Sequence, residues 1–263
     1  MKRRTKIALA LPLVVFAAIG ARTAMQTPSL ARTWDQDVRV LAGVDRHPDG
    51  AVTLTNVRDW SYAVDSIVAQ PYFDATFDPA DIVDVWMYEQ ILDSERGLIA
   101  HTFVVFEFDS TYGDARWLGL SVETRREVGE TYSLVGGMLR AFEVTHIWAT
   151  ERDLVTRRVL LLDYPLTRYR LVLSPDQRAR IFTRFAQETQ DLAERPAWYN
   201  TVTRNCTSSL VRYANESRPG AIPWHRSWVL TGGMDDYLAE LGYLDPASAV
   251  RITRDWLASN PLR

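Results

Sequence analysis

The order of strand-like and helix-like segments is the feature that most constrains the fold of this chain. Several segments in its first two thirds either alternate in polarity or combine β-branched with aromatic side chains, as strands do. They are residues 51–57, 82–92, 101–109, 117–126, 139–148 and 168–173. Residues 110–114 (STYGD) form a short loop with glycine, so the two segments beside it are predicted to form a hairpin.

Helix signals follow the strand-like segments. Residues 174–177 (SPDQ) combine an N-cap serine, proline at the first helical position and glutamine at N3, which predicts a helix over 175–194. Two further helices are predicted over 205–215 and 235–241, the second ending at Gly242. Strands followed by helices indicate an α+β fold, with an antiparallel sheet packed against helices, rather than a parallel α/β fold.

Residues 1–31 differ from the rest of the chain in charge and hydropathy. The basic start MKRRTK precedes the apolar stretch IALALPLVVFAAIGA at 7–21, which has the proportions of a secretory signal. A helix of this length covers ~22 Å, less than the ~30 Å hydrocarbon core of a bilayer. We therefore expect 1–31 to be a signal peptide or, if it is not cleaved, a short membrane anchor helix.

Residues 32–263 have the composition of one folded, exported domain. The chain is 47% hydrophobic, and outside the leader 25 basic residues face 33 acidic ones, a formal charge of −8. This charge argues against nucleic acid as a partner, because binding to phosphates requires a basic surface. No segment of 32–263 reaches the ~18 apolar residues of a spanning helix.

Cys206 is the only cysteine, so an intramolecular disulfide is excluded. It follows Asn205, a favourable N-cap, which predicts that the thiol lies in the first turn of a helix. The helix dipole and the free N–H groups of that turn stabilise a thiolate and can also bind an oxyanion. These are the requirements for acyl transfer through a thioester. The alternative is an inert cysteine packed as a small apolar residue.

A cysteine nucleophile usually needs a base, and the chain has four histidines. His47 lies in a predicted turn, His225 in a proline-flanked loop, and His146 in mid-strand, where a structural role is expected. His101 opens a predicted strand, where a side chain can reach a cleft, and is therefore the candidate base.

The hairpin register provides a partner for His101. If Asp109 pairs with Ala115 across the loop, His101 lies opposite Glu123. Opposed side chains on one face are ~5 Å apart, so the carboxylate could orient the imidazole and support its charged form. A slip of one residue would remove this pairing, and Glu123 would then be a surface carboxylate beside Arg125 or Arg126.

Three motifs occur in a characteristic order: GLSVETRREVGE at 119–130, ERDL at 151–154, and YN followed by NCT within 199–207. Together they resemble the family of the Lnb N-terminal periplasmic domain, over roughly residues 51–245. Members resemble thiol-dependent lipoprotein N-acyltransferases. The order of histidine and cysteine is also similar to that of the lecithin–retinol acyltransferase group, which implies a permuted papain-like (NlpC-type) fold. The family's acyltransferases carry a transmembrane region after this domain, and residues 32–263 contain no such segment.

The resemblance implies a role for each site residue. Cys206 is the nucleophile and His101 the base. Glu123 is the third member, which its place in the shared run and the hairpin register both favour. For substrate or oxyanion binding the candidates are Asn205, Thr207 and Tyr199.

The expected function is that of a periplasmic, membrane-associated cysteine acyltransferase or hydrolase. Its partners would be the inner-membrane surface and a phospholipid or lipoprotein substrate. Trp224, Trp228 and Trp256 either line such an interface or pack in the core. Two alternatives stay open: a cell-wall peptidase or amidase with the same dyad, and a non-catalytic periplasmic binding protein. No cluster has the spacing of metal ligands, so neither a metal nor another cofactor is expected.

Overall fold

The computed structural model describes residues 20–262 except residues 22, 94 and 219. The strands are β1 (Gly43–Arg46), β2 (Val52–Arg58), β3 (Ser61–Ala63), β4 (Ser66–Ala69), β5 (Tyr72–Phe77), β6 (Ile82–Ile91), β7 (Ala100–Phe108), β8 (Trp117–Arg125), β9 (Glu143–Thr150), β10 (Leu166–Leu171) and β11 (Leu244–Ile252). The helices are α2 (Leu134–Met138), α3 (Glu151–Thr156), the π-helix η4 (Arg157–Leu161), α4 (Pro175–Glu194), α5 (Cys206–Ser217), α6 (Met234–Glu240) and α7 (Arg254–Ser259). Short 3₁₀ helices are η1 (Gln36–Val38), η2 (Pro79–Asp81), η3 (Ser110–Arg116) and η5 (Arg226–Trp228).

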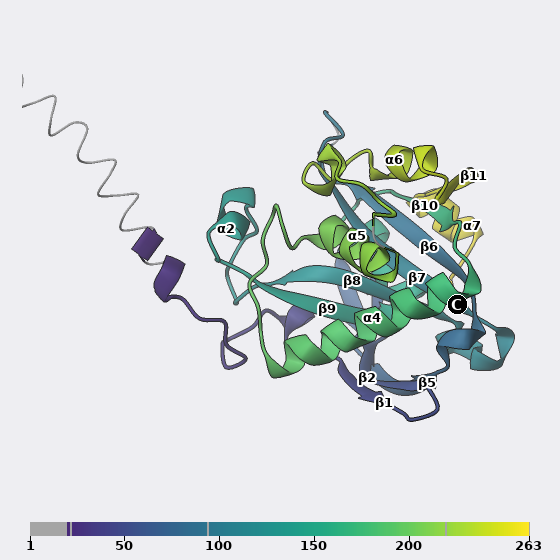
Figure 1. Cartoon of the computed structure of the whole chain (residues 1–263), viewed down its shortest axis with the longest axis horizontal. Coiled ribbons are helices and arrows are strands. Elements are labelled where there is room, and N and C mark those ends of the chain that lie inside the picture. Colours follow the sequence, from purple (N-terminus) through teal and green to yellow (C-terminus); the bar gives the residue numbers. More distant parts are fainter. Residues whose placement is uncertain (1–19, 22, 94, 219, 263) are drawn as a thin grey trace, which may run out of the picture.

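Within the described residues, nine strands form one sheet in the order β1-β2-β9-β8-β7-β6-β10-β11, with β5 paired to β2 (Figure 1). Its ladders are antiparallel except between β2 and β9, which pair in parallel at Arg58 and Ala149. The prediction of mixed helices and strands is confirmed, but the sheet is mixed rather than purely antiparallel. The permuted papain-like arrangement stays a prediction.

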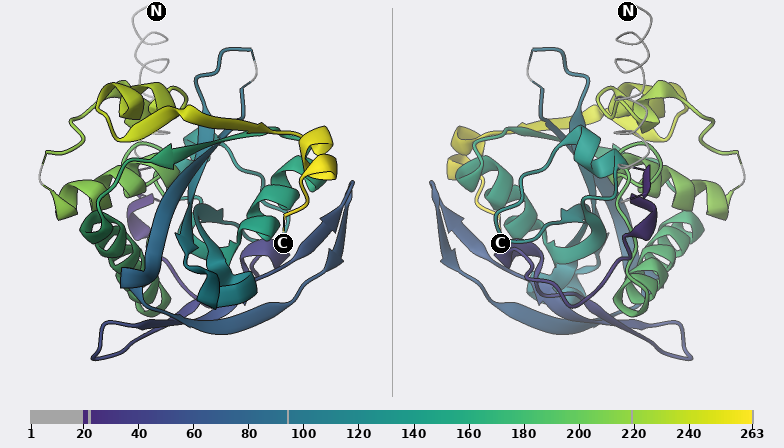
Figure 2. Two further views of the ribbon diagram at one scale, coloured as in Figure 1. Left: turned by 90° about the vertical axis from the view of Figure 1, so that its right-hand side faces the viewer. Right: turned by 90° about the vertical axis from the view of Figure 1, so that its left-hand side faces the viewer.

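Helices cover both faces of the sheet (Figure 2). On one face, α4 and α5 pack against alternate residues of β7 and β8, including Val104, Phe106 and Leu120. On the other face, α3, η4 and α7 pack against the intervening residues, including Phe103 and Val105. Because side chains alternate along a strand, β7 and β8 therefore present successive residues to two different helical layers.

The predicted hairpin has the expected register. β7 and β8 pair from Phe103 with Ser121 to Glu107 with Trp117, the same register that places His101 opposite Glu123. The ladder stops at Phe103 although β7 begins at Ala100 and β8 continues to Arg125. The first residues of β7 therefore lie where the two strands are no longer joined by backbone hydrogen bonds.

The helix starts and ends that the sequence predicts are present. Ser174 and Gln177 form a capping box at the start of α4, and the Asn205 side chain caps α5. The chain after α6 turns at Gly242, whose φ of 76° lies in the left-handed region that glycine adopts without strain.

The predicted strand over 139–148 and the predicted order of strands and helices are both partly wrong. β9 begins only at Glu143, because residues 134–138 form α2 and the N–H groups of Leu139 and Ala141 still bond to carbonyls of this helix. α3 and η4 also precede β10, and the unpredicted β11 follows all of the larger helices. In β11 the residues DPAS at 245–248 hide the strand pattern, and the pairing with β10 has a shifted register there.

The predicted signal or anchor helix falls mainly on residues outside those described. Residues 20–21 and 23–25 are helical, and Arg140 Nη1 after α2 donates a hydrogen bond to the carbonyl of Thr23 at 3.1 Å. Among the residues that the structure describes, no helix is both long and apolar enough to cross a membrane.

Candidate active site

Cys206 is the first residue of α5 and is 5% exposed. The Asn205 carboxamide oxygen accepts from the Ser208 N–H at 2.7 Å, and Ser208 Oγ accepts from the Asn205 N–H at 2.9 Å. This reciprocal cap fixes the first turn of the helix. The thiol therefore lies at the positive end of the helix dipole, as the sequence predicts.

The Asn205 side chain holds two loops in addition to the helix. Its Nδ2 donates to the carbonyl oxygens of Thr201, at 2.8 Å, and Trp228, at 2.9 Å. Both amide hydrogens are thus directed to backbone carbonyls. Asn205 supports the position of Cys206 and joins the loop before α5 to the segment of η5.

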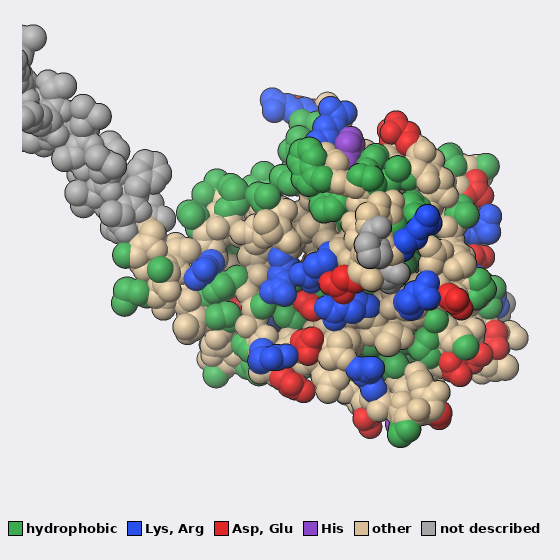
Figure 3. Space-filling view, viewed as in Figure 1, with side chains coloured by type: hydrophobic (Ala, Val, Ile, Leu, Met, Phe, Trp, Pro, Cys, Tyr) green, Lys and Arg blue, Asp and Glu red, His purple; other side chains and the backbone are tan. Residues whose placement is uncertain are grey.

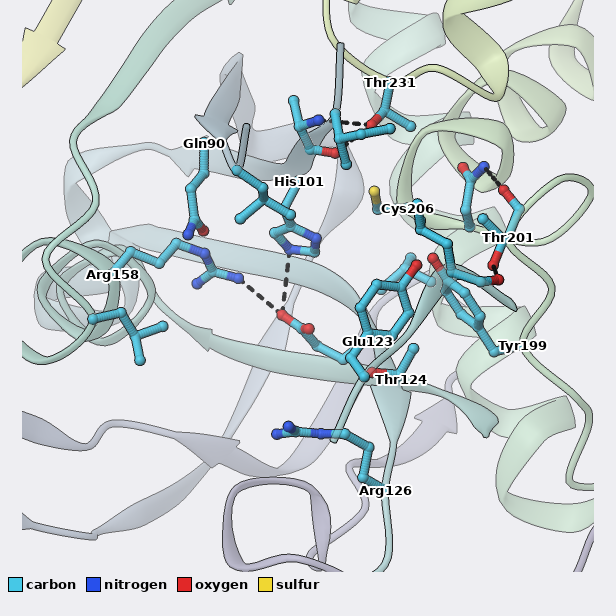
Figure 4. Close-up of a pocket in the computed structure, with 18 of the residues that line it drawn as sticks. Gln90, His101, Glu123, Thr124, Arg126, Arg158, Tyr199, Thr201, Cys206 and Thr231 are labelled. Carbon is cyan, nitrogen blue, oxygen red and sulfur yellow. Dashed lines mark hydrogen bonds and ion pairs between the residues drawn. The ribbon is translucent and has the colours of Figure 1, made fainter. Parts of the chain in front are cut away.

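His101 and Cys206 come from opposite sides of the sheet. His101 shares the face of β7 that packs on η4, whereas Cys206 belongs to a helix on the other face. They meet beyond the last backbone pair of β7 and β8, where the strands separate. Figure 4 shows the sulfur beside the imidazole ring, close enough for the charges of the two groups to act on each other.

Glu123 lies on the far side of the imidazole from the sulfur (Figure 4). His101 Nε2 is 3.3 Å from Glu123 Oε1 and 2.8 Å from Ser121 Oγ, and the Ser121 hydroxyl donates to Glu123 at 2.7 Å. The imidazole thus reaches the carboxylate directly and through Ser121. With Nε2 engaged in this way, Nδ1 is the ring nitrogen left for Cys206.

Arg158 is a member of the site that sequence reasoning missed. Its side chain is 2% exposed, and its Nη2 donates to Glu123 Oε1 at 2.8 Å and to Ser121 Oγ at 3.1 Å. Nη1 donates to the Leu154 carbonyl, and the guanidinium lies 4.5 Å from the ring centroid of Phe103. A buried arginine and a histidine therefore share one carboxylate.

These charges shift the pKa of each group. Burial disfavours the charged form of His101, but Glu123 and Cys206 outweigh it and raise the pKa of His101 to about 9. Burial likewise opposes ionisation of Cys206, yet His101 lowers the pKa of the thiol to about 7. His101 and Arg158 hold the pKa of Glu123 well below its ordinary value despite burial. Between pH 7 and 9 the site is therefore a thiolate–imidazolium pair backed by a carboxylate.

A cavity of about 300 Å³ opens beside the cysteine, and both Asn205 and Tyr199 line it. Tyr199 packs edge-to-face on Tyr132, with ring centroids 6.2 Å apart, and the two hydroxyls interact. Burial and the nearby Cys206 charge raise the pKa of Tyr199, so its hydroxyl stays protonated. Thr207 instead lines a separate apolar cavity between α4, α5 and α6, and its Oγ1 is 3.0 Å from Thr102 Oγ1.

The other histidines lie elsewhere. His47 is 2.7 Å from Thr53 Oγ1, and His225 caps η5 and stacks on Tyr237. His146 is 3% exposed, with Nδ1 2.9 Å from Thr189 Oγ1 in α4. Of these four histidines, His101 is the one that lines the cavity of Cys206.

The tryptophans divide between core and surface. Trp256 packs partly buried against the cluster of α3, η4 and α7, and Trp228 packs against α5 and α6. Trp224 is 73% exposed.

Sequence reasoning also did not predict Ser121 and Tyr132 as site residues, although the sequence contained a signal for Ser121. Ser121 is two residues before Glu123 and so shares its face of β8. Arg158 carried no such signal, because η4 is brought to the site only by the packing of α3 on the sheet.

Comparison with known proteins identifies the family. The family model described as the Lnb N-terminal periplasmic domain matches residues 69–231, more than half of the chain, and the match includes His101, Glu123 and Cys206. No curated protein and no solved structure matches the chain. The family description indicates a periplasmic protein. The chain therefore belongs to the family of the Lnb N-terminal periplasmic domain.

Proposed function

We propose that this protein is an exported, membrane-associated cysteine acyltransferase or hydrolase that acts through a thioester on a lipid or lipoprotein. The observation that carries the proposal is the placement of one cysteine at a helix start, against an imidazole that a partly buried carboxylate supports. Inert buried cysteines have raised pKa values, whereas the pKa of Cys206 is lowered to about 7. This difference favours the catalytic function over the non-catalytic one.

The resting state is the thiolate–imidazolium pair, so at pH 8 Cys206 is already ionised and needs no base to remove its proton. The thiolate attacks the carbonyl carbon of the ester, a C–S bond forms, and the carbonyl electrons move to the oxygen. The tetrahedral intermediate then collapses, the C–O bond breaks, and the leaving alkoxide takes the proton of the His101 imidazolium. Neutral His101 next removes a proton from an amine or water, which attacks the thioester and releases Cys206.

Stabilisation of the oxyanion is assigned to groups at the start of α5. The N–H groups of Cys206 and Thr207 belong to the first helical turn, where the helix supplies no backbone acceptor. The Tyr199 hydroxyl, which stays protonated and lies close to the thiol, is the candidate side-chain donor. Thr207 would contribute through its backbone, because its side chain lines the other cavity.

The lining of the cavity favours a substrate with acyl chains over a cell-wall peptide. Aliphatic side chains lie beside the polar groups in its lining, among them Leu92, Ile99, Leu134, Leu162 and Val229. Ester or amide recognition at the polar centre and apolar contacts around it suit a lipid or the lipidated end of a lipoprotein.

The test is direct detection of the acyl-enzyme. The full chain is incubated with phospholipid vesicles, with a diacylated lipopeptide, and with a peptidoglycan peptide, and the intact mass is measured after acid quench. We expect Cys206 to gain one fatty acyl group, which hydroxylamine removes, and the Cys206→Ser variant to gain no thioester. A peptide adduct would instead support the alternative function of a cell-wall peptidase or amidase. If no adduct forms and the thiol reacts no faster than free cysteine, the result would support the alternative of a non-catalytic periplasmic binding protein.

A further inference from the structure

Four segments on one side of the Cys206 cavity contain no aspartate or glutamate. They are residues 23–34, 131–142, 195–215 and 220–234, here called the acid-free face. Outside the leader the chain has 33 acidic and 25 basic residues, so their absence from these four segments is a marked segregation of charge.

Side-chain hydrogen bonds join the four segments into one surface. Arg140 Nη1 donates to the Thr23 carbonyl at 3.1 Å, and Thr201 Oγ1 donates to the Leu134 carbonyl at 2.9 Å. The Asn205 amide donates to the Trp228 carbonyl at 2.9 Å. Tyr132, Leu134, Tyr199, Cys206 and Val229 line one side of the cavity from this face, and the opposite side is lined by other segments, which include Asp37 and Glu123.

Large apolar side chains are exposed on the acid-free face. Met25 is 82% exposed, Val135 60%, Met138 45% and Trp224 73%. Figure 3 shows hydrophobic side chains gathered over α2 and above α5. Monomeric soluble domains rarely expose such groups together, and their concentration marks an interaction surface.

Arginine is the charged residue of this face. Arg140 and Arg226 are exposed, and neither forms an ion pair within the part of the chain that the structure describes. Exposed cations without acids, beside apolar and tryptophan side chains, are complementary to anionic phosphates above acyl chains. A protein partner uses the same kinds of side chains, so the apolar leader beside this face is what favours a bilayer.

The leader reaches the domain at the same place. Its apolar stretch at 7–21 has the composition of a membrane-inserting segment, and Thr23, directly after it, is bonded to Arg140 beside α2. Residues 20–21 and 23–25 project from the side of the domain that carries α2 (Figure 1). An uncleaved leader would therefore hold α2 close to the bilayer.

We infer that the acid-free face docks on an anionic phospholipid bilayer and that the Cys206 cavity opens toward the lipid. Val135 and Met138 of α2 and Trp224 enter the headgroup region, and Arg140 and Arg226 contact phosphates. The docking itself does not depend on the reaction. The further consequence, that substrate acyl chains enter from the bilayer, rests on the proposed function.

Two valines of similar exposure allow a matched test of docking. In the full chain with Cys206→Ser, Val135→Cys and Val68→Cys each provide one thiol, because the protein has no other cysteine; the native side chains are 60% and 66% exposed. The cysteine of each variant is labelled with a nitroxide, and the labelled protein is mixed with phosphatidylethanolamine–phosphatidylglycerol vesicles. We expect the label at 135 to lose collisions with an aqueous nickel chelate and to gain collisions with oxygen, while the label at 68 in β4 stays aqueous. Two aqueous labels would overturn the inference, as would lipid-independent spin–spin broadening at 135, which would indicate a second copy.

A second measurement separates docking from catalysis. Val135→Asp should lower turnover of an ester carried in vesicles by about tenfold, because an interfacial charge weakens docking, and should leave alkylation of Cys206 by a small soluble reagent unchanged. Val68→Asp is the control and should change neither. If vesicle turnover is equal in both variants, the bilayer does not deliver the substrate through this face. If no variant turns over ester but the label at 135 is buried in lipid, docking holds and the proposed function fails.

Discussion

Two strand histidines, His101 partly buried and His146 fully buried, lie on opposite faces of the same sheet, and their surroundings give them opposite properties. His101 on β7 lies beside Glu123 and Cys206, which outweigh burial and raise its pKa to about 9. His146 on β9 is buried near Arg204 and Arg212, and burial together with these cations lowers its pKa to about 3. Burial is common to both, so the sign of the shift comes from the neighbouring charges.

The difference also separates two uses of a polar side chain in a sheet. His146 Nδ1 and Trp148 Nε1 both bond to Thr189 Oγ1, which joins β9 to α4 as a structural hydrogen-bond cluster. His101 lies where the strands separate, and its second ring nitrogen faces the cavity. A histidine that is neutral and tied at mid-strand supports the fold, whereas one that is charged at a strand end can exchange a proton.

Replacing each histidine in turn tests the difference between them most strongly. His101→Ala should return the pKa of Cys206 to 9.0 or above, so the thiolate fraction at pH 7 falls from about a half to about 1% and alkylation slows by roughly 50-fold. Turnover should fall by ~10²–10⁴, the usual contribution of a general acid–base group. The rate of reaction with iodoacetamide measures the first effect.

His146→Gln is the matched control and should leave the alkylation rate unchanged wherever circular dichroism shows the variant to be folded. An equal loss of rate in both variants would mean that thiol reactivity follows stability rather than the ion pair.

Glu123→Gln should produce the next largest effect, on stability. It removes the negative charge beside Arg158, whose side chain is 2% exposed, and breaking such a pair by removing one partner costs about 3 kcal/mol. Urea unfolding measures the loss. Glu127→Gln, which breaks the partly exposed pair with Arg32, should cost about 0.5 kcal/mol. Similar losses in the two variants would show that Arg158 does not depend on Glu123.

Thr189→Val tests the structural role of the hydrogen bonds around His146. It leaves His146 and Trp148 without their hydroxyl partner, which should lower the free energy of unfolding by ~1–2 kcal/mol. Alkylation of Cys206 should not change, because Thr189 lies in α4 and does not line the Cys206 cavity. A change in the alkylation rate would show that the two histidine environments are coupled through the sheet.

The pH dependence of stability has opposite signs for the two histidines. The raised pKa of His101 contributes stability that is complete below pH 6.5 and is lost as the pH rises through about 9. The lowered pKa of His146 contributes stability that is complete above pH 6.5 and is lost as the pH falls toward 3. Each changes stability by at most ~1.4 kcal/mol per pH unit. Cys206 opposes His101 between pH 7 and 9, because its own pKa is lowered.

Resonances of the two imidazoles in ¹H–¹⁵N spectra measure the titrations directly. We expect the ring of His101 to remain protonated at pH 8 and that of His146 to remain neutral at pH 5. An imidazole of His101 that is neutral at pH 7 would contradict the ion pair with Cys206. It would leave His101 as a simple general base.

Local patterns predicted the parts of the site that depend on short stretches of chain. The Asn205 cap is a contact between neighbouring residues, and the hairpin register follows from one loop, so both are as predicted. The register alone placed His101 opposite Glu123. The side-chain directions of Asn205 and Thr207 did not follow from their motif, because the loop carbonyls and Thr102 that orient them come from distant segments.

The sequence by itself determined a cysteine at a helix start, a histidine opposite a carboxylate on a hairpin, and a leader that is basic at its start and then apolar. These depend on capping, strand alternation and composition, which act over a few residues. The tertiary structure decided that α5 and the start of β7 meet where two strands separate, that Arg158 shares Glu123, and that four acid-free segments lie together on one side of the cavity. Each of these requires groups far apart in the chain to be buried together, and the free energy that selects them arises from packing the whole sheet between its helices.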